Sequence, residues 1–265
     1  DGRFKLNLEP SGTVSMADPL AIDDLRLKVF SEFHQAHRGS HNRQPWHVDF
    51  SSGRWSSQKG GPNRRIRSIV HRNDEGEPDG VVSYEIDKDF GSQITVVDMV
   101  ATTPNAEVAL WEFLASVDLI ETIKAPQVDP ATPLPWAVED PRVVTFTRHT
   151  DLGWLRILDV DRAMAVRGWD HQGSVTFHVT DSMGYAEGTW RVDVDAPGAP
   201  ATVTRVDDST DAATLDVAAL GSLYFGMGRG FSLAAAHRIT GTDEQIAAVD
   251  RMFSTVDVAH NISEF

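Results

Sequence analysis

Apolar positions recur along the first half of the chain with two different spacings. In residues 20–36 they are three or four positions apart, as in Leu25, Val29 and Phe33, which predicts a helix that Gly39 ends. Pro104 opens a second predicted helix, which runs to about Val117. Alternating apolar positions predict strands over residues 4–8, 65–70, 81–86 and 94–100, with a loop at 51–63 and a turn at 73–76.

Five prolines then fall between positions 126 and 141. Proline removes backbone donors and disfavours regular structure, so we expect a domain boundary here or just after. Beyond it, strands are predicted over residues 143–147, 174–179, 188–194 and 201–206, with a short helix at 159–167. The end of the chain reads as helices over 217–225, 232–237 and 243–252. Strands that precede helices in this way predict an α+β fold.

Composition narrows the class of protein. The chain has 265 residues, of which 41% are hydrophobic and 24% charged, enough to build a core. It contains no run of 18 apolar residues, so we expect no membrane span. With no cysteine, disulfides and thiolate metal sites are excluded. The net charge of -15 argues against nucleic acid and favours cationic ligands. We expect a cytoplasmic protein.

Two motifs suggest chemistry that their context does not support. His34, His37 and His41 have the spacing of one helix face and could bind zinc, but Gly39 is expected to end the helix before His41. We favour a polar helix end there and predict no metal site. The glycines of residues 226–230 resemble a phosphate loop, but a helix rather than a strand is predicted before them. They are expected to break one helix and start the next.

Longer stretches of the chain carry a family resemblance. Residues 154–160, 215–226 and 251–255, followed by a terminal Phe, are similar to the C-terminal sterol-carrier-like domain of the Eis (enhanced intracellular survival) acetyltransferases of actinobacteria. Residues 80–84, 94–100 and 109–111 resemble that family's central acetyltransferase-like domain, as do residues 118–123 and 133–142. The resemblance runs in order along the whole chain.

The resemblance implies a domain organisation. Residues 1–148 are expected to form a second GNAT-like domain without an acetyl-CoA site, and residues 149–265 a sterol-carrier-protein-2-like domain. The turn at residues 101–106 has no glycine, and its Pro104 has no N–H, so it is poorly suited to a pyrophosphate. The family's catalytic domain, which binds acetyl-CoA, would precede this chain. Asp1 opens the sequence without an initiator Met, which suggests a chain entered midway, and we expect this part alone to be inactive.

The resemblance also implies a mechanism. In Eis-like enzymes the terminal carboxylate is the general base for acetylation of an amine, and here that group belongs to Phe265. Glu264 adds a second negative group that would help bind a polycationic substrate, either aminoglycoside-like or a lysine side chain. The general acid, a tyrosine in the family, would lie in the catalytic domain, and relatives are hexamers. The approach to the tail, residues 258–262, departs from the family pattern.

An alternative from another class is a lipid- or ligand-binding module without catalysis. Sterol-carrier-like folds elsewhere hold apolar ligands in a tunnel. Five aromatic residues of the second half could line one, although they are equally suited to a core: Trp154, Phe177, Trp190, Tyr224 and Phe225.

Overall fold

The computed structural model describes residues 4–58, 60–87, 92–151 and 153–263. Contacts divide the chain into two units, Asp1–Thr150 with His260–Phe265, and Asp151–Ala259. The sequence-based division at residue 148 assigned the C-terminal tail to the second domain. In the structure the tail groups with the first unit.

The first unit is built on a five-stranded sheet with the order β1-β2-β3-β4-β5. Its strands are β1 (Thr13–Ala17), β2 (Arg67–Arg72), β3 (Pro78–Ile86), β4 (Gln93–Ala101) and β5 (Thr122–Lys124). The helices are α1 (Asp23–Ala36), α2 (Trp46–Ser52), α3 (Pro104–Ala115) and α4 (Leu134–Ala137), followed by a 3₁₀ turn at Pro141–Val143. Neighbouring strands are antiparallel except β4 and β5, which are parallel.

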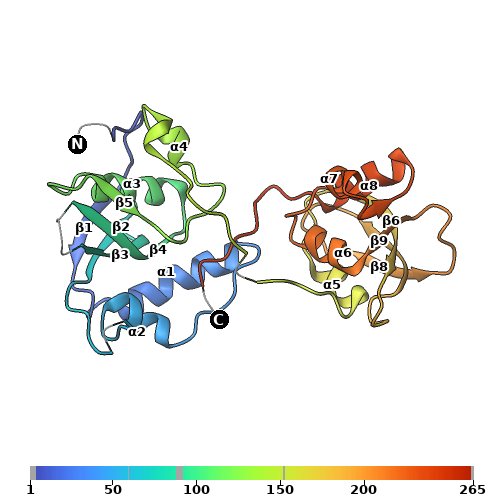
Figure 1. Ribbon diagram of the computed structural model, residues 1–265, viewed down its shortest axis with the longest axis horizontal. Helices are drawn as coiled ribbons and strands as arrows, with labels where there is room; N and C mark the ends of the chain where they lie inside the picture. The colour runs from blue at the N-terminus through green and yellow to red at the C-terminus, as the bar shows by residue number, and fades with distance from the viewer. Residues whose placement is uncertain (1–3, 59, 88–91, 152, 264–265) are drawn as a thin grey trace. The chain divides into compact units, whose positions relative to one another are not determined.

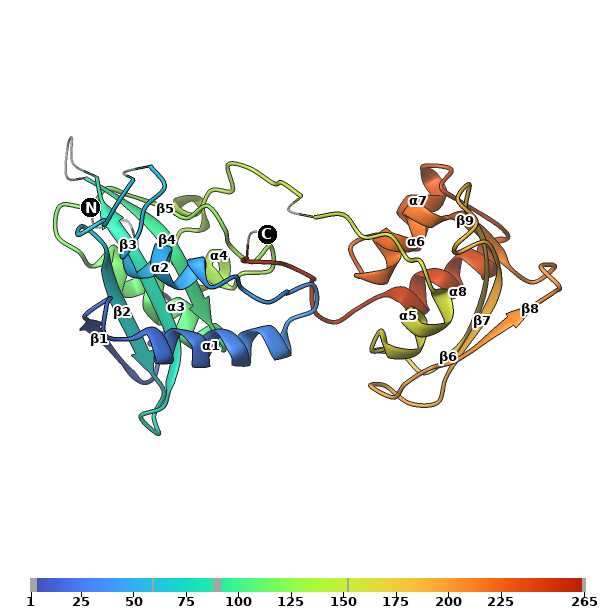
Figure 2. The same cartoon turned by 90° about the horizontal axis from the view of Figure 1, so that it is seen from below.

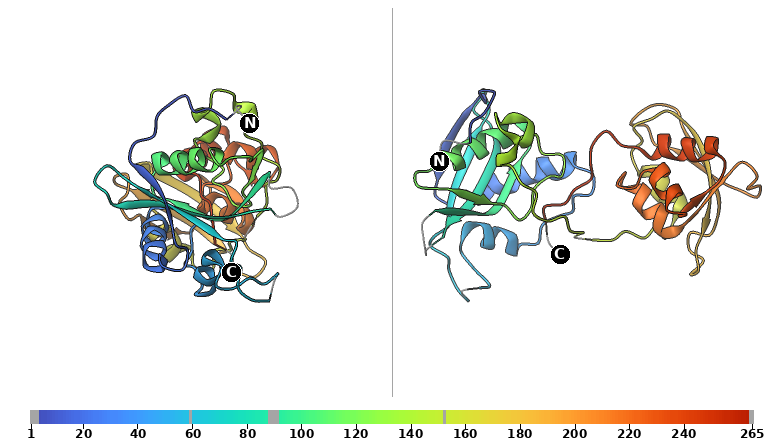
Figure 3. Two further views of the ribbon diagram at one scale, coloured as in Figure 1. Left: turned by 90° about the vertical axis from the view of Figure 1, so that its left-hand side faces the viewer. Right: turned by 45° about the horizontal axis from the view of Figure 1, so that its top comes forward.

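Alternation along the strands sorts the apolar side chains of this unit onto two faces. Ile69, Val82 and Ile94 pack with the apolar face of α3. Their sequence neighbours Val70 and Val81 pack instead with α1, in a separate cluster. The sheet is therefore covered by α3 on one face and by α1 on the other, as Figure 1 and the left view of Figure 3 show.

Strands β4 and β5 pair over a short stretch only. The register joins Gln93–Thr95 of β4 to Thr122–Lys124 of β5, and the rest of β4 continues beyond the end of β5. The sheet edge next to residues 96–101 of β4 is thus left to other parts of the chain.

The second unit has a sheet of order β10-β9-β6-β7-β8. Its strands are β6 (Gly173–Thr180), β7 (Gly188–Val194), β8 (Thr202–Val206), β9 (Ala213–Asp216) and β10 (Ile239–Thr240). The helices are α5 (Val160–Val166), α6 (Val217–Tyr224), α7 (Gly230–Ala235) and α8 (Asp243–Phe253). Figure 2 shows the helices gathered on one side of this sheet.

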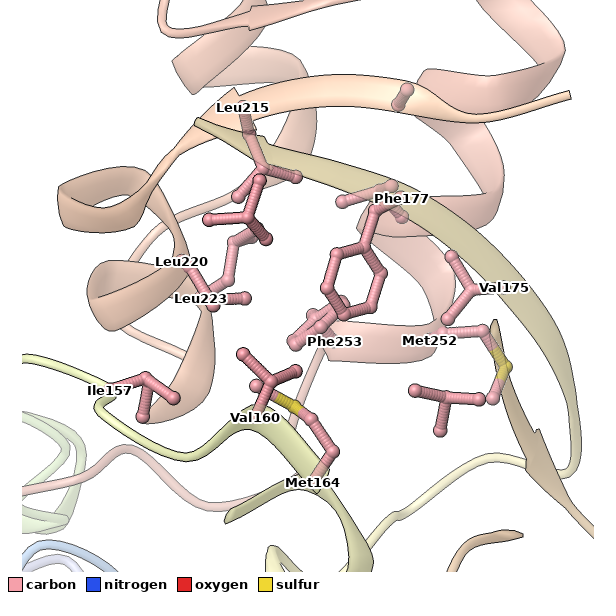
Figure 4. Close-up of a cluster of buried hydrophobic side chains, with 14 of the residues drawn as sticks. Ile157, Val160, Met164, Val175, Phe177, Leu215, Leu220, Leu223, Met252 and Phe253 are labelled. Atoms are coloured by element: carbon pink, nitrogen blue, oxygen red, sulfur yellow. The ribbon is translucent and has the colours of Figure 1, made fainter. Parts of the chain in front are cut away.

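The core of the second unit lies between these helices and the sheet. Phe177 of β6 and Phe253 of α8 are fully buried and meet edge-to-face, with ring centroids 5.6 Å apart. Figure 4 shows Met164 and Leu220 directed into the same space from α5 and α6. Burying large side chains of this kind contributes about 1.5–3 kcal/mol each.

A buried arginine ties two helix ends of this unit together. Arg167, 6% exposed, donates to the backbone oxygens of Tyr224 at 2.8 Å and Phe253 at 2.7 Å. These are the last residues of α6 and α8, whose final carbonyls have no partner within the helix. Arg167 thus donates hydrogen bonds to carbonyl groups whose burial without a partner would cost free energy.

The α+β class predicted from the sequence is confirmed, but two of the predicted strands are wrong. Residues 4–8 do not join a sheet, because Asn7 N–H donates to the carbonyl of Ala137 and Lys5 accepts from Glu139. Residues 144–147 have no regular structure after the 3₁₀ turn. The structure also has β1, β5, β9, β10, α2 and α4, which the sequence did not predict.

Candidate functional site

The first candidate place is the turn before α3, at residues 101–106. Thr103 caps the helix, and its hydroxyl oxygen accepts from Ala106 N at 3.1 Å. The carboxylate of Asp79 accepts from the same hydroxyl at 3.3 Å. Pro104, the first residue of the helix, has no N–H. An anion at this helix terminus would therefore meet a proline without a donor, an Ala106 N–H that is already used and a carboxylate close by.

The second place is the C-terminal segment, residues 260–263, which packs against the first unit. Ile262, 6% exposed, belongs to the cluster formed by α1 and the sheet. His260 N donates to the carbonyl of Arg38 at 3.3 Å, and its ring lies 5.4 Å from that of Phe33. In the right view of Figure 3 this segment, in dark red, runs into the unit that contains α1.

Asn261 holds this segment in a tight turn. Its Oδ1 accepts from Ser263 N at 3.1 Å, and its Nδ2 donates to the carbonyl of Ser263 at 2.6 Å. The same amide lies 2.7 Å from Nε2 of His41. Ser263 is fully buried, so the backbone conformation two residues before Phe265 is fixed by hydrogen bonds and packing.

A buried ion pair lies next to this turn. Arg43 donates to both carboxylate oxygens of Asp98, at 2.6 and 2.8 Å. The two side chains are only 8% and 13% exposed. Nε of Arg43 donates to Oγ of Ser263 at 3.4 Å, and its guanidinium carbon lies 4.3 Å from the ring centroid of Phe30. Arg43 therefore contacts the sheet, α1 and the tail at once.

The tail lies beside the sheet edge where β4 extends beyond β5. A cavity of about 10 Å³ is lined there by residues 96–99, by Pro126 and Gln127, and by Ile262. That is room for about one water molecule. Ile262 therefore fills part of the space beside β4.

The two predicted site residues are not among those that the structure describes. Glu264 and Phe265 are outside the described residues, and their predicted roles stay predictions. Nδ1 of His34 lies 3.0 Å from Oγ of Ser40, and Nδ1 of His37 is 2.8 Å from the carbonyl of Phe33. In the described ranges, no three His, Cys, Asp or Glu side chains are placed to hold a metal.

The glycines of residues 226–230 have a structural role. Gly226 follows α6 with a φ of 75°, which favours glycine. A side chain at Gly230 would lie 2.9 Å from the backbone of Asp250, where α7 meets α8. They separate α6 from α7, as the sequence indicated, and Gly230 also lets α7 approach α8.

Of the aromatic residues considered for an apolar tunnel, Trp190 and Tyr224 pack against the same core that contains Phe177. Phe177 is fully buried in the core, whereas Trp154 is 92% exposed. The hydroxyl of Tyr224 donates to the carbonyl of Ala163 at 3.2 Å, so its polar end is used inside the unit. Core packing accounts for Phe177, and nothing in these positions favours a shared ligand tunnel.

Sequence reasoning missed the site formed by the tail, Arg43 and Asp98. Positions 43, 98 and 263 are far apart in the chain, and no local pattern connects them. The only signal was the unusual approach to the terminus at residues 258–262, where a buried Ile262 stands between a turn-forming Asn261 and Ser263.

Comparison with known proteins assigns a class to each unit. Residues 39–157 match an acetyltransferase (GNAT) domain, and residues 160–259 match a sterol carrier protein domain. The second match ends at 259, where the chain returns to the first unit. The chain thus combines a GNAT domain with a sterol-carrier-like domain.

Its relatives define the family more closely. The chain is 38% identical over 186 residues to an uncharacterized N-acetyltransferase of Streptomyces avermitilis, covering 68% of this chain and 44% of that protein. It is 33% identical over 189 residues to the N-acetyltransferase Eis of Mycobacterium tuberculosis, covering 70% of this chain and 43% of Eis. The chain is therefore a homologue of the Eis-like N-acetyltransferases.

Solved structures of related proteins agree with this assignment. The crystal structure of Eis1 from Mycobacterium abscessus matches with a TM-score of 0.81 and 26% identity, over 99% of this chain and 66% of that one. A GCN5-related N-acetyltransferase from Anabaena variabilis shares the fold, with a TM-score of 0.76 at 16% identity, over 99% of this chain and 65% of that one. The matched segments span less than half the length of the two curated relatives named above. None of the helices in the described ranges is long and apolar enough to cross a bilayer.

Proposed function

We propose that this chain is the C-terminal part of an acetyl-CoA-dependent N-acetyltransferase that acts on amines of polycationic substrates. The α-carboxylate of Phe265 is its general base. The observation that carries this proposal is the return of residues 260–263 to the GNAT-like unit, which binds the tail two residues before Phe265.

Charge supports the choice of substrate class. The chain has a net charge of -15, which raises the local concentration of a polycation such as an aminoglycoside-like amine or a lysine-bearing peptide. Glu264 and Phe265 bring two carboxylates to the end of the tail, and both attract ammonium groups. Relatives named as N-acetyltransferases support the reaction type.

The reaction requires a proton to leave the amine before it attacks the thioester. The amine nitrogen forms a bond to the acetyl carbon, the carbon–sulfur bond breaks, and coenzyme A leaves as the thiol. An α-carboxylate has a reference pKa of about 3.5, so it is a weak base but always ionised at pH 7. Holding it beside the ammonium offsets part of that mismatch.

We further propose that acetyl-CoA binds in a region that the relatives have before the matched segment. The turn at residues 101–106 supports this, because it lacks glycine and is flanked by the carboxylate of Asp79. The general acid belongs to that same region, so this chain alone is expected to be inactive. A homo-oligomer, hexameric by analogy, and a cytoplasmic location complete the proposal.

The test is thiol release from acetyl-CoA with a polyamine acceptor. Three proteins are compared: the chain extended by the N-terminal region of its relatives, the same protein without Phe265, and this chain alone. Activity in the first only supports the enzyme and the terminal base. Activity that survives removal of Phe265 rules out the terminal carboxylate. Turnover by this chain alone would locate the acetyl-CoA site in its own GNAT domain, and no turnover by any form rejects the function.

A further inference from the structure

We infer that the Arg43–Asp98 ion pair is the anchor that positions the last residues of the chain. Arg43 is a positioning residue, which acts on the reaction through the tail. This inference rests on the proposed function for its catalytic consequence, whereas the anchoring itself is a property of the described residues.

Burial restricts the side chains of Arg43 and Asp98 to pairing with each other. Both side chains are mostly removed from water, and charges in that setting are tolerated only with full pairing. The bidentate geometry fixes the plane of the guanidinium against Asp98 on β4. The ring of Phe30 lies against that guanidinium 4.3 Å away, which prevents rotation of the arginine.

The fixed guanidinium then presents Nε to the tail. Ser263 Oγ accepts from it at 3.4 Å, and Ser263 is fully buried against this group. On its other side the turn made by Asn261 holds the backbone of Ser263. Two independent sets of contacts therefore define the position of the same residue.

The position of Ser263 limits where the terminal carboxylate can lie. Phe265 is two residues further along the chain, and two residues span at most about 7 Å. A carboxylate that acts as a base must lie within hydrogen-bond distance of its proton, about 2.6–3.2 Å. Release of Ser263 would spread the carboxylate over positions from which it cannot act.

A role limited to stability would give a different result. Removing an ion pair that only stabilises the unit lowers the amount of folded protein, whereas kcat per folded enzyme, KM and the pH profile stay unchanged. Removing an anchor lowers kcat per folded enzyme and is expected to leave the Michaelis constant for acetyl-CoA unchanged, because the proposed cofactor site lies in another region.

The test uses Arg43→Met, which keeps the apolar contact with Phe30 and removes the guanidinium, together with Arg43→Lys and Asn261→Ala. Arg54→Met is the matched control, since Arg54 pairs with Asp23 and Asp49 in the same unit. Hydrogen exchange of residues 260–263 is measured in this chain, and kcat, KM and the pH profile in the N-terminally extended protein. Exchange of β3 reports whether the unit is folded.

We expect Arg43→Met to accelerate exchange of the tail about tenfold or more while β3 is unchanged. Its kcat should fall about 10- to 100-fold, with KM for acetyl-CoA within about twofold. Arg43→Lys should recover part of kcat, Asn261→Ala should release the tail with the ion pair intact, and Arg54→Met should change neither reading.

Unchanged hydrogen exchange of residues 260–263 in Arg43→Met overturns the anchor. An equally large change of exchange and of kcat in Arg54→Met also overturns it. If Arg43→Met does not fold, unchanged exchange and kcat in Asn261→Ala overturn it instead. An inactive wild-type extended protein overturns the proposed function and the catalytic role of Arg43, whereas tail exchange still decides whether Arg43 anchors residues 260–263.

Discussion

Replacing Arg167 with Met should destabilise the second unit more than any exposed arginine substitution. The change removes two short hydrogen bonds, to the carbonyls of Tyr224 at 2.8 Å and Phe253 at 2.7 Å. A hydrogen bond to a charged group contributes about 1.5–3 kcal/mol, so the two together give about 3–6 kcal/mol. The guanidinium also lies 4.6 Å from the ring centroid of Trp169, a contact that methionine replaces only in part.

The assay is hydrogen exchange of the slowest amides of β6, compared with those of β3 in the first unit. A tenfold change in exchange rate corresponds to about 1.4 kcal/mol. The predicted loss of about 3–6 kcal/mol in the stability of the second unit therefore accelerates exchange of β6 by roughly 10²- to 10⁴-fold. Arg162→Met is the matched control, because Arg162 is exposed on α5, the helix that Arg167 directly follows, and should change stability by no more than about 0.5 kcal/mol. A loss below about 1 kcal/mol for Arg167→Met would falsify the argument that Arg167 satisfies these buried carbonyls.

Two other changes test packing and titration. Gly230→Ala would place a methyl group 2.9 Å from the backbone of Asp250 and should cost about 1–3 kcal/mol in urea unfolding, whereas Ser232→Ala on the same helix should be neutral. Burial raises the pKa of Glu107, despite the opposing hydrogen bond from Thr132. The folded state therefore binds more protons than the unfolded state, and stability falls as pH rises from the unfolded pKa of about 4.3 through the higher folded value. Glu107→Gln should remove that part of the pH dependence, measured by urea unfolding at several pH values, and a slope identical to wild type would contradict it.

The long, strongly patterned elements were predictable from the sequence. Helix α1 follows from apolar residues three or four positions apart, and α3 from Pro104 at its first position with Thr103 as its cap. Strands β6 and β7 alternate, β3 and β4 contain short apolar runs, and each of the four has seven or more residues. In these stretches local preference and tertiary packing agree.

The missed elements are short or lack a buried face. β1 has no fully buried residue in its five positions, since it is an edge strand paired on one side only. β5, β9 and β10 have three, four and two residues, too few for a period to be visible. Residues 4–8 show the opposite error, because their alternation is real but they form only an isolated bridge to Val138, just after α4, and no strand of a sheet.

The candidate site could be predicted only in part. The sequence already indicated that the turn before α3 is poorly suited to bind a pyrophosphate, because the absence of glycine and the presence of Pro104 are local properties. The contact of Arg43 and Asp98 with Ser263 was not, because it depends on the return of the tail to the first unit. That return is set by tertiary packing of Ile262 with the α1 cluster.

The return of residues 260–263 also links the stabilities of the two units. Unit 2, roughly 110 residues long, is joined to unit 1 through the chain at its start and through the docked tail at its end. While the tail stays bound, an unfolded unit 2 is a closed loop, which has lost conformational entropy relative to a free chain. A permanent closure of that length lowers the entropy of the unfolded state by the equivalent of about 4–5 kcal/mol. The tail therefore acts as a reversible cross-link, and weakening its anchor in unit 1 would lower the unfolding temperature of unit 2, whose own contacts are unchanged.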